Sequence, residues 1–371
     1  MFSQIKPKSI TTKSIQNNIL QTFIVKKGLT FIIFLHIFVL INLSACGQLW
    51  GWGRARSLGI GEPENLLILS PVHIMDDVAT VSIDIDFTMA IKTDGSLWAW
   101  GRNTSGQLGD GTNEWQLSPV HIMDDVIAVD TSQFDTMVIL PDNSLWTWGR
   151  GRIPPWGEHF HVMDDIIAVS FAGGSPSIDK HVLVIETDGT LWSWGNNWAG
   201  QIGDGTTEFR ETPVHIMDDV IAVDTGHFHT VAIQTDGSLW AWGSNSWGQV
   251  GNNSNIAQYS PVHIMDDVIA VATGSIHTAA IRADGSLWAW GSNEYRQLGL
   301  GIASPSEVRS PVHVMDNVVA VSAGQDNVMA LQEDGSVWVW GYFFLDGPLR
   351  REHIWEPVRI IGGTSHDDDR Q

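Results

Sequence analysis

Cysteine is almost absent from this chain of 371 residues, in which Cys46 is the only one. A single thiol excludes a disulfide framework and cysteine-rich metal or iron–sulfur sites. Lysine is also scarce after residue 45, where only Lys92 and Lys180 occur. Residues 46–371 carry 15 basic and 42 acidic side chains, a net charge of −27 against −22 for the whole chain. Such an acidic body repels phosphate backbones and anionic lipid, so we expect no nucleic-acid partner.

The first 45 residues have the features of an export signal. Lys26 and Lys27 precede an apolar run, residues 29–43, which is shorter than the roughly 20 residues that span a bilayer. Ser44 and Ala45 then precede Cys46, a pattern that resembles a bacterial lipoprotein signal, in which the cysteine becomes the lipidated first residue of the mature chain. We therefore predict a signal peptide over residues 1–45 and a lipid anchor on Cys46, which is the protein's only contact with the membrane.

This assignment predicts an extracytoplasmic location in a bacterial cell envelope. Gly47 follows the cysteine in place of the aspartate that often marks retention in the inner membrane, so the outer membrane is favoured where one exists. A second interpretation stays open, because Cys46–Trp50 is in register with Asp94–Trp98 of the repeat described below. Residues 30–45 would then be two strands, although the run has no turn residues where a turn is needed and no alternation of period two.

Tryptophan, in contrast, is abundant, with 19 residues that mark a repeat. The pattern Leu-Trp-x-Trp-Gly recurs at intervals of 46 to 50 residues and contains 14 of the 19 tryptophans. Its copies begin at Leu49, Leu97, Leu145, Leu191, Leu239 and Leu287, with an altered copy at Val337. Self-similarity at a period near 48 is typical of propeller or solenoid architectures.

Each repeat contains four short elements that have the properties of strands. One is Pro-Val-His-Ile-Met-Asp-Asp, as at residues 119–125, and two others flank an Asp-Gly pair such as Asp94-Gly95. Asp-Gly between two apolar runs predicts a hairpin with a type I′ turn. Four strands per repeat predict a propeller blade. Because the connection from Trp-Gly to Pro-Val is the long one, we expect it to cross between blades.

The repeat resembles the regulator of chromosome condensation repeat. The likeness rests on Trp-x-Trp-Gly, on Asn103–Thr112 with its Gly-Gln-Leu-Gly core, and on Gly226–Thr230. The third copy, after Gly149, and the seventh, after Gly341, lack the loop motif. The resemblance implies an all-β, seven-bladed propeller over residues 46–361, followed by a polar tail, residues 362–371. Counting elements leaves the first and last strands over, so we expect an imperfect closing blade shared by both termini, with six blades as the alternative.

Repeated side chains give two sets of candidate residues. We expect the paired tryptophans to pack between blades, because a large residue at a fixed strand position fills the same gap in each blade. The histidines of the second element recur once per blade, and ligands spread around a ring do not converge on one ion, so we predict no metal site. The aspartates after them should form an acidic rim on one face, at Asp76, Asp77, Asp124, Asp125, Asp164, Asp165, Asp218, Asp219, Asp266, Asp267 and Asp316.

The loops after Trp-Gly vary most and add one tryptophan in five of seven repeats. Loops on a rigid scaffold carry function and tryptophan is common at binding hot spots, which makes these residues candidate contacts. They are Trp115, Trp156, Trp198, Trp247 and Trp355.

No catalytic motif was found: the sequence has no Gly-x-Ser-x-Gly, no phosphate-binding loop and no His-Glu-x-x-His. We therefore predict a monomeric, non-enzymatic propeller without a cofactor that binds an unidentified protein. Two alternatives stay open: a lectin that binds cell-surface polysaccharide through its loop tryptophans, and an exported propeller hydrolase. The family resemblance implies members as different as a nuclear guanine-nucleotide exchange factor and a secreted β-lactamase inhibitor, so fold alone does not decide.

Overall fold

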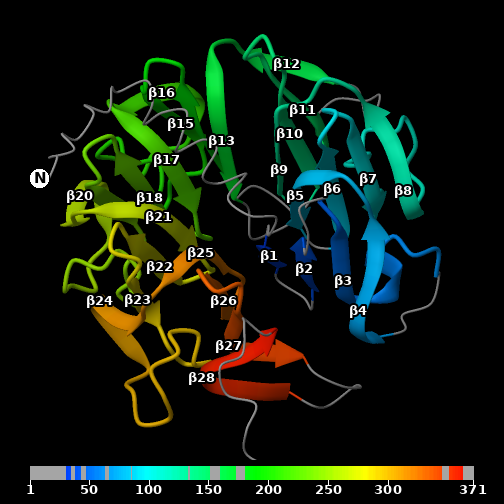
Figure 1. The fold of residues 1–371 in the computed structure, drawn as a ribbon. Helices are drawn as coiled ribbons and strands as arrows, with labels where there is room; N and C mark the ends of the chain where they lie inside the picture. Colours follow the sequence, from blue (N-terminus) through cyan, green and yellow to red (C-terminus); the bar gives the residue numbers. More distant parts are fainter. Residues whose placement is uncertain are drawn as a thin grey trace, which may run out of the picture.

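Seven four-stranded antiparallel sheets surround a common centre in the computed structural model (Figure 1). The structure describes residues 31–34, 38–42, 47–62, 67–84, 86–132, 134–150, 159–172, 180–344 and 351–361. Apart from one 3-10 turn, η1 (Ala55–Ser57), every helix or strand in these residues is a β-strand. The all-β propeller is therefore confirmed.

Six of the sheets are blades built entirely from strands of the repeat, the number that the sequence analysis kept as its alternative. Each blade uses four consecutive strands, and the first strand of each blade contacts the first strand of the next around the centre of the ring. The first three blades are β5 (Val78–Asp84), β6 (Phe87–Lys92), β7 (Leu97–Gly101) and β8 (Gln116–Met123); β9 (Ala128–Ser132), β10 (Asp135–Ile139), β11 (Leu145–Gly149) and β12 (Phe160–Met163); and β13 (Ile166–Ala172), β14 (His181–Glu186), β15 (Leu191–Gly195) and β16 (Arg210–Met217). The other three are β17 (Val220–Thr225), β18 (His229–Gln234), β19 (Leu239–Gly243) and β20 (Gln258–Met265); β21 (Val268–Thr273), β22 (His277–Arg282), β23 (Leu287–Ser292) and β24 (Glu307–Met315); and β25 (Val318–Ala323), β26 (Asn327–Gln332), β27 (Val337–Phe344) and β28 (Arg351–Ile361).

The seventh sheet, which we call the closing sheet, joins two strands of the repeat to two earlier strands. Its order is β1 (Phe31–Phe34), β2 (Phe38–Asn42), β3 (Leu49–Arg54) and β4 (Leu67–Met75). Strand β1 contacts both β5 and β25, so it completes the circle of first strands. Both β1 and β2 lie in the segment that the sequence analysis assigned to a signal peptide, with strands as the second interpretation.

The expected division into blades was wrong in two respects. The long connection after Trp-Gly does not cross between blades, because it joins the third and fourth strands of one sheet, as from β7 to β8. The crossing is made by the Met-Asp-Asp turn, whose second aspartate has a positive φ, as in Asp77, where it is 60°. The termini therefore do not share a blade: β28 pairs with β27, and β3 pairs with β4. A hydrogen bond holds this short turn against the next blade: the Thr93 N–H donates to the Asp77 carbonyl, 2.7 Å away.

The Asp-Gly hairpins are confirmed, but the predicted turn type is wrong. Gly95 has a φ of 85°, whereas Asp94 is not among the residues with positive φ, so the type I′ geometry is excluded. The Gly95 N–H donates to the Lys92 carbonyl and the Lys92 N–H to the Ser96 carbonyl, which is the three-residue loop with glycine in the left-handed position. Aspartate suits this loop because its carboxylate accepts hydrogen bonds from the Ser96 N–H and Oγ, at 3.0 and 2.6 Å.

Contacts between neighbouring blades place the core between them. The second tryptophan of a repeat is almost completely buried against the preceding blade, as Trp148, Trp242 and Trp290 show. The Nε1–H of Trp242 donates to the Gln201 carbonyl in the loop of the preceding blade, 2.9 Å away, and Thr230 Oγ1 donates to the same carbonyl at 2.8 Å. We call this pair of bonds the loop clamp. It recurs at the carbonyls of Gln107 and Gln249, and its tryptophan bond alone is found at Ser57 and Gln297. The prediction that the tryptophans pack between blades is confirmed for this position.

A glycine in each complete loop makes room for the clamping indole. Gly203 has a φ of 91°, and a Cβ there would lie 2.6 Å from Nε1 of Trp242. Gly109, Gly251 and Gly299 occupy the same position against Trp148, Trp290 and Trp340. The Gly-Gln-Leu-Gly loop and the tryptophan of the next blade are therefore parts of a single contact.

A second set of bonds links the inner strands through half-buried aspartates. Asp130 on β9 accepts hydrogen bonds from Ser82 on β5, at 3.2 Å, and from the Phe171 N–H on β13, at 2.8 Å. Asp224 on β17 accepts from the Thr273 N–H on β21, at 2.7 Å. Desolvation raises the pKa of Asp130 to about 7 despite these bonds, and the charge of Asp224 adds to the rise. One carboxyl thus contacts three blades.

We predict that Gly203→Ala destabilises the propeller. Left-handed backbone costs a residue with a Cβ about 1–2 kcal/mol, and the collision with Trp242 adds to that cost. Gly205→Ala is the matched control, because its φ of 83° is similar while its Cβ would meet Ser260 Oγ at an ordinary 3.5 Å. Thermal and urea unfolding should show a clearly larger loss for Gly203→Ala, and equal losses would contradict the clamp.

The raised pKa of Asp130 predicts a specific pH dependence of stability. Its carboxyl binds a proton in the folded chain up to about pH 7, whereas an unfolded aspartate loses it near pH 4. Stability should therefore fall as pH rises between these values, with a slope of up to about 1.4 kcal/mol per pH unit from this group. Asp130→Asn should flatten the curve of unfolding free energy between pH 4 and 7. Parallel curves for the two proteins would show that Asp130 titrates normally.

Candidate functional site

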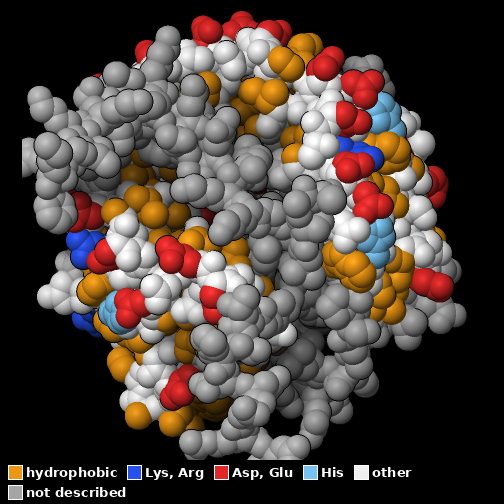
Figure 2. Space-filling view, viewed as in Figure 1, with side chains coloured by type: hydrophobic (Ala, Val, Ile, Leu, Met, Phe, Trp, Pro, Cys, Tyr) orange, Lys and Arg blue, Asp and Glu red, His pale blue; other side chains and the backbone are white. Residues whose placement is uncertain are grey.

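The two ends of the strands give the ring two chemically different faces. Long loops join the third strands to the fourth strands at one end, which we call the loop face. The Asp-Asp turns and the Asp-Gly hairpins lie together at the other end, which we call the Asp face, where Gly95 lies beside Asp125 of the following turn. Figure 2 shows acidic side chains scattered over one face of the ring with few basic ones.

Histidine and aspartate form a repeated surface unit on the Asp face. His121 Nε2 lies 2.8 Å from Asp124 Oδ1, and the imidazole contacts the ring of Trp98 edge-on at 5.4 Å. Five other blades or sheets contain the same unit, on His73, His161, His215, His263 and His313. The histidine is therefore a partner for the first tryptophan and the first aspartate, and the second aspartate makes the left-handed turn. All eleven aspartates of the predicted rim are exposed, and their role in binding stays a prediction.

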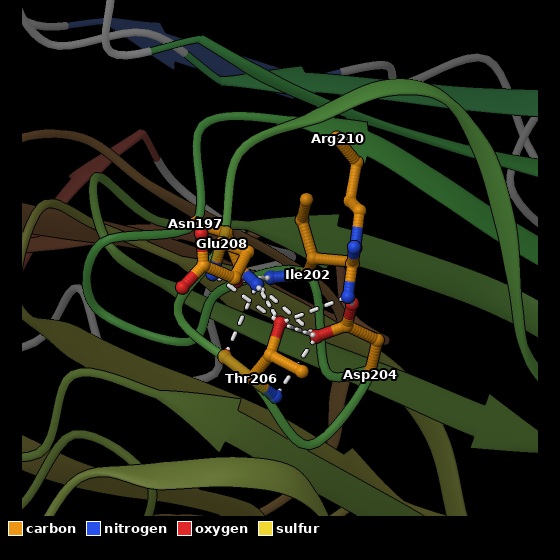
Figure 3. A network of polar contacts seen from close by, with 6 residues as sticks. All are labelled: Asn197, Ile202, Asp204, Thr206, Glu208 and Arg210. Carbon is orange, nitrogen blue, oxygen red and sulfur yellow. Dashed lines mark hydrogen bonds and ion pairs between the residues drawn. The ribbon is translucent and has the colours of Figure 1, made fainter.

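An asparagine holds each complete loop on the loop face, and in two of these loops it donates to an aspartate. Figure 3 shows such a loop for residues 197–210. Asn197 Nδ2 donates to Asp204 Oδ1 and to the Thr206 carbonyl, both at 3.1 Å, and Asn197 Oδ1 accepts from the Ile202 N–H. Asp204 also accepts from the Thr206 N–H and forms an ion pair with Arg210. Asn103 and Asp110 repeat the arrangement in an earlier blade.

Asp204 stabilises its own loop. Burial alone would raise the pKa of Asp204, but the hydrogen bonds from Thr206 and the charge of Arg210 outweigh it and hold the pKa below its ordinary value. The carboxylate oxygens already accept bonds from within the loop. Within the described part of the chain, no group of three or more His, Cys, Asp or Glu side chains is placed to hold a metal ion.

The predicted loop tryptophans differ in their surroundings. Trp198 is 56 % exposed, whereas Trp115 is covered by the Arg56 guanidinium, 3.7 Å from its ring centre, and Trp247 is half-buried. Trp355 lies in strand β28 and not in a loop, which corrects the prediction, and the Arg296 guanidinium contacts its ring at 4.8 Å. Trp156 and Cys46 lie outside the described residues.

Trp198 packs on a residue that the sequence analysis did not select. Its ring lies 4.6 Å from that of Phe228, which comes from the turn between the first two strands of the next blade. The equivalent turn residue, Phe134, has the guanidinium groups of Arg102 and Arg150 at 4.9 and 5.1 Å. The signal was present in the sequence, because Phe228 lies inside the Gly-His-Phe-His-Thr motif, but only the fold shows that this motif and the long loop share a face.

Several basic side chains of the described residues lie on the loop face, whereas Arg282 pairs with Asp267 on the Asp face. On the loop face, Arg56, Arg102 and Arg150 lie against aromatic rings, Lys180 pairs with Asp135, and Arg210 pairs with Asp204. The loop face therefore combines cationic and aromatic groups, and the Asp face is strongly acidic. No helix in the described residues is long and apolar enough to cross a membrane.

Comparison with known proteins identifies the repeat. A family model, the regulator of chromosome condensation (RCC1) repeat, matches residues 94–139, 188–233, 236–281 and 284–331, which make up half of the chain. A zebrafish (Danio rerio) protein, "Protein RCC2 homolog", is 37% identical over 79 residues, which are 20% of this chain and 16% of that protein. The mouse (Mus musculus) "Protein RCC2" is 39% identical over 59 residues, 16% of this chain and 11% of that protein. The chain thus matches less than a fifth of the length of these curated relatives.

Solved structures show the same fold at low identity. The yeast propeller in the structure titled "Crystal structure of Kap60 bound to yeast RCC1 (Prp20)" has a TM-score of 0.72 and 17% identity, over 98% of this chain and 90% of that one. Human WBSCR16 has a TM-score of 0.69 and 19% identity, over 85% of this chain and 94% of that one. These similarities show the propeller fold over most or nearly all of the chain.

The Asp204 network predicts that one substitution loosens a single loop. Asp204→Ala removes the acceptor for Asn197, Thr206 and Arg210, so amides of residues 197–210 should exchange with solvent at least about tenfold faster. The corresponding change in the neighbouring loop, Asn252→Ala, removes one such acceptor and should leave residues 197–210 unchanged. Hydrogen exchange read by mass spectrometry checks both, and unchanged exchange in Asp204→Ala would contradict the structural role.

Proposed function

Because the chain belongs to the regulator of chromosome condensation repeat family, we propose that it is a non-enzymatic propeller that binds a protein partner through its loop face. The observation that carries the proposal is Trp198, which is 56 % exposed on a clamped loop and supported from below by Phe228. A large aromatic side chain held rigidly at a surface loses little entropy on binding and is typical of interface hot spots.

The fold is consistent with this proposal, because the yeast propeller RCC1 (Prp20) has the same fold and binds other proteins. Its structure bound to Kap60 is known, and it has binding properties toward Gsp1p and histones. At 17% and 18% identity this likeness supports protein binding as a class and does not identify the partner of this chain. The acidic Asp face is unsuited to a nucleic-acid partner, because phosphate backbones would be repelled.

The location of this propeller is part of the same proposal. We infer that the chain is exported, is lipidated on Cys46 and acts outside the cytoplasm of a bacterial cell, with the outer membrane favoured. The support is the order of Lys26 and Lys27, the apolar run, the small residues and the single cysteine. A diacylated cysteine inserts enough chain length for stable anchoring.

Photo-crosslinking on intact cells tests the binding face. A crosslinking amino acid at position 198 should capture a protein, and Trp198→Ala should weaken binding to that protein at least about tenfold. Trp115→Ala is the matched control, because Trp115 lies in an equivalent loop but is covered by Arg56. If position 198 captures nothing while a glycan array binds the wild type and not Trp198→Ala, the lectin alternative replaces the proposal. Hydrolysis of ester, peptide or sialoside probes by the purified chain would favour the hydrolase.

Cell fractionation tests the anchor. Wild-type protein should sediment with membranes and require detergent for release, whereas Cys46→Ala should appear in the soluble fraction because the acyl chains are missing. Mass spectrometry of the mature N-terminus provides the control, since it should begin at a lipid-modified Cys46. Membrane association that persists in Cys46→Ala would exclude the lipid anchor.

A further inference from the structure

The inner half of the closing sheet comes from the apolar run that precedes Cys46. Strands β1 and β2, residues 31–34 and 38–42, lie within residues 29–43, which the sequence analysis assigned to the membrane-directed part of a signal peptide. The same residues thus have two possible destinations, a membrane and the centre of the propeller.

The closing sheet is built in the register of the repeat blades. Strand β2 pairs with β3 through Phe38↔Gly53 and Ile41↔Trp50. In a repeat blade, β18 pairs with β19 in the same way, through His229↔Gly243 and Ala232↔Trp240. The turn that follows also matches, because the Val78 N–H donates to the Gly47 carbonyl at 2.7 Å, as the Val268 N–H does to the Gly237 carbonyl at 2.9 Å.

The lack of alternation in this apolar run fits a second strand of this propeller. In β18, residues 229–233 are all buried, and in β22, residues 277–281 are all buried. A strand covered on both faces needs apolar side chains at successive positions and so shows no period of two. The lack of alternation is therefore no argument against strands in this chain, because the second strands of its repeat blades are buried on both faces.

Without β1 and β2 the ring would be open. Strand β1 contacts β5 and β25, and β2 pairs with every residue of β3 from Leu49 to Gly53. Cleavage before Cys46 would separate both strands from the chain and leave the inner edge of β3 unpaired. An unpaired strand edge between two blades is a template for another strand.

We propose that the inner edge of β3 is a strand-acceptor site whose ligand is a pair of apolar antiparallel strands, and that β1 and β2, residues 31–34 and 38–42, are its occupants in the uncut chain. Membrane insertion and ring closure then exclude each other, because one segment cannot do both. The site exists whether or not Cys46 is lipidated. Only the event that would empty the site, cleavage of the signal peptide during export, rests on the proposed function.

A cleavable full-length chain tests the site. Residues 43–46 are replaced by the recognition sequence of a specific protease, the chain is folded without membranes, and it is then cut. The N-terminal fragment should remain bound in size-exclusion chromatography and the melting temperature should stay within a few degrees of the uncut value. Leu40→Pro, which removes a ladder hydrogen bond from the central strand β2, should release the fragment after cutting. Leu20→Pro, which lies before the strands, is the control and should not. Release of the unmodified fragment with no change in melting temperature would overturn the proposal.

A disulfide test covers the case in which Leu40→Pro does not fold. In a full-length Cys46→Ser chain, Leu40→Cys with Gly51→Cys should crosslink spontaneously, because these residues are register partners. Asn42→Cys with Gly51→Cys is displaced by two residues and should not. Equal crosslinking of both pairs, or of neither, would contradict the site. Neither experiment uses Trp198, so failure here and failure of the proposed binding face are distinguished.

Discussion

The hydrogen bond from a buried tryptophan indole to a loop carbonyl of the preceding blade is the contact on which the rest of the propeller depends. A four-stranded blade cannot bury its faces alone, so its stability comes from its neighbours. The indole of Trp242 fills the gap between two blades, and its buried Nε1–H donates to the Gln201 carbonyl, so the polar atom of the indole has a partner. The same contact determines the shape of the loop, because Gly203 must leave room for the ring. One bond therefore joins blade packing to the surface that carries the proposed function.

Where a copy of the repeat lacks the loop motif, the contact between loop and tryptophan is altered too. The third copy lacks the Gly-Gln-Leu-Gly loop, and the tryptophan that such a loop would cover, Trp194 in the next blade, is half-buried instead of fully buried. In the same blade Thr190 replaces the serine that elsewhere accepts the bond from the first tryptophan, and the Trp192 Nε1–H has no partner. This blade itself has a complete loop, which includes Trp198. Its exposed aromatic group thus lies on a rigid loop.

Much of this architecture could be predicted from the sequence because the repeat is strong. A period near 48, the Asp-Gly hairpins and the position of paired tryptophans indicated four-stranded blades, and the structure has them. The division into blades could not be obtained from loop lengths alone. The long loop joins two strands of one blade and contacts the tryptophan of the next blade. The length of the loop does not reveal this contact. Trp355 was misplaced for a similar reason, since β28 is 11 residues long and begins earlier than its counterparts.

The N-terminal segment shows how one composition can satisfy two environments. A run of apolar residues suits the interior of a bilayer and the doubly covered inner strands of this ring equally well, so hydrophobicity could not distinguish them. At the candidate site, the sequence predicted a residue but not the contact that supports it. Trp198 was selected from its position in a loop, but its support, Phe228, lies about 30 residues away in the sequence and in another blade, and contacts of that kind follow only from the fold.

Hydrogen exchange of the tryptophan side chains tests the central contact most directly. With indole nitrogens labelled, the Nε1–H signals of Trp100, Trp148, Trp242, Trp290 and Trp340 should exchange only as fast as the propeller opens, because each is buried and bonded to a loop carbonyl. The Nε1–H of the exposed Trp198 should exchange near the rate of free tryptophan. If the five indoles exchange as fast as Trp198, the loop clamp does not hold the blades together.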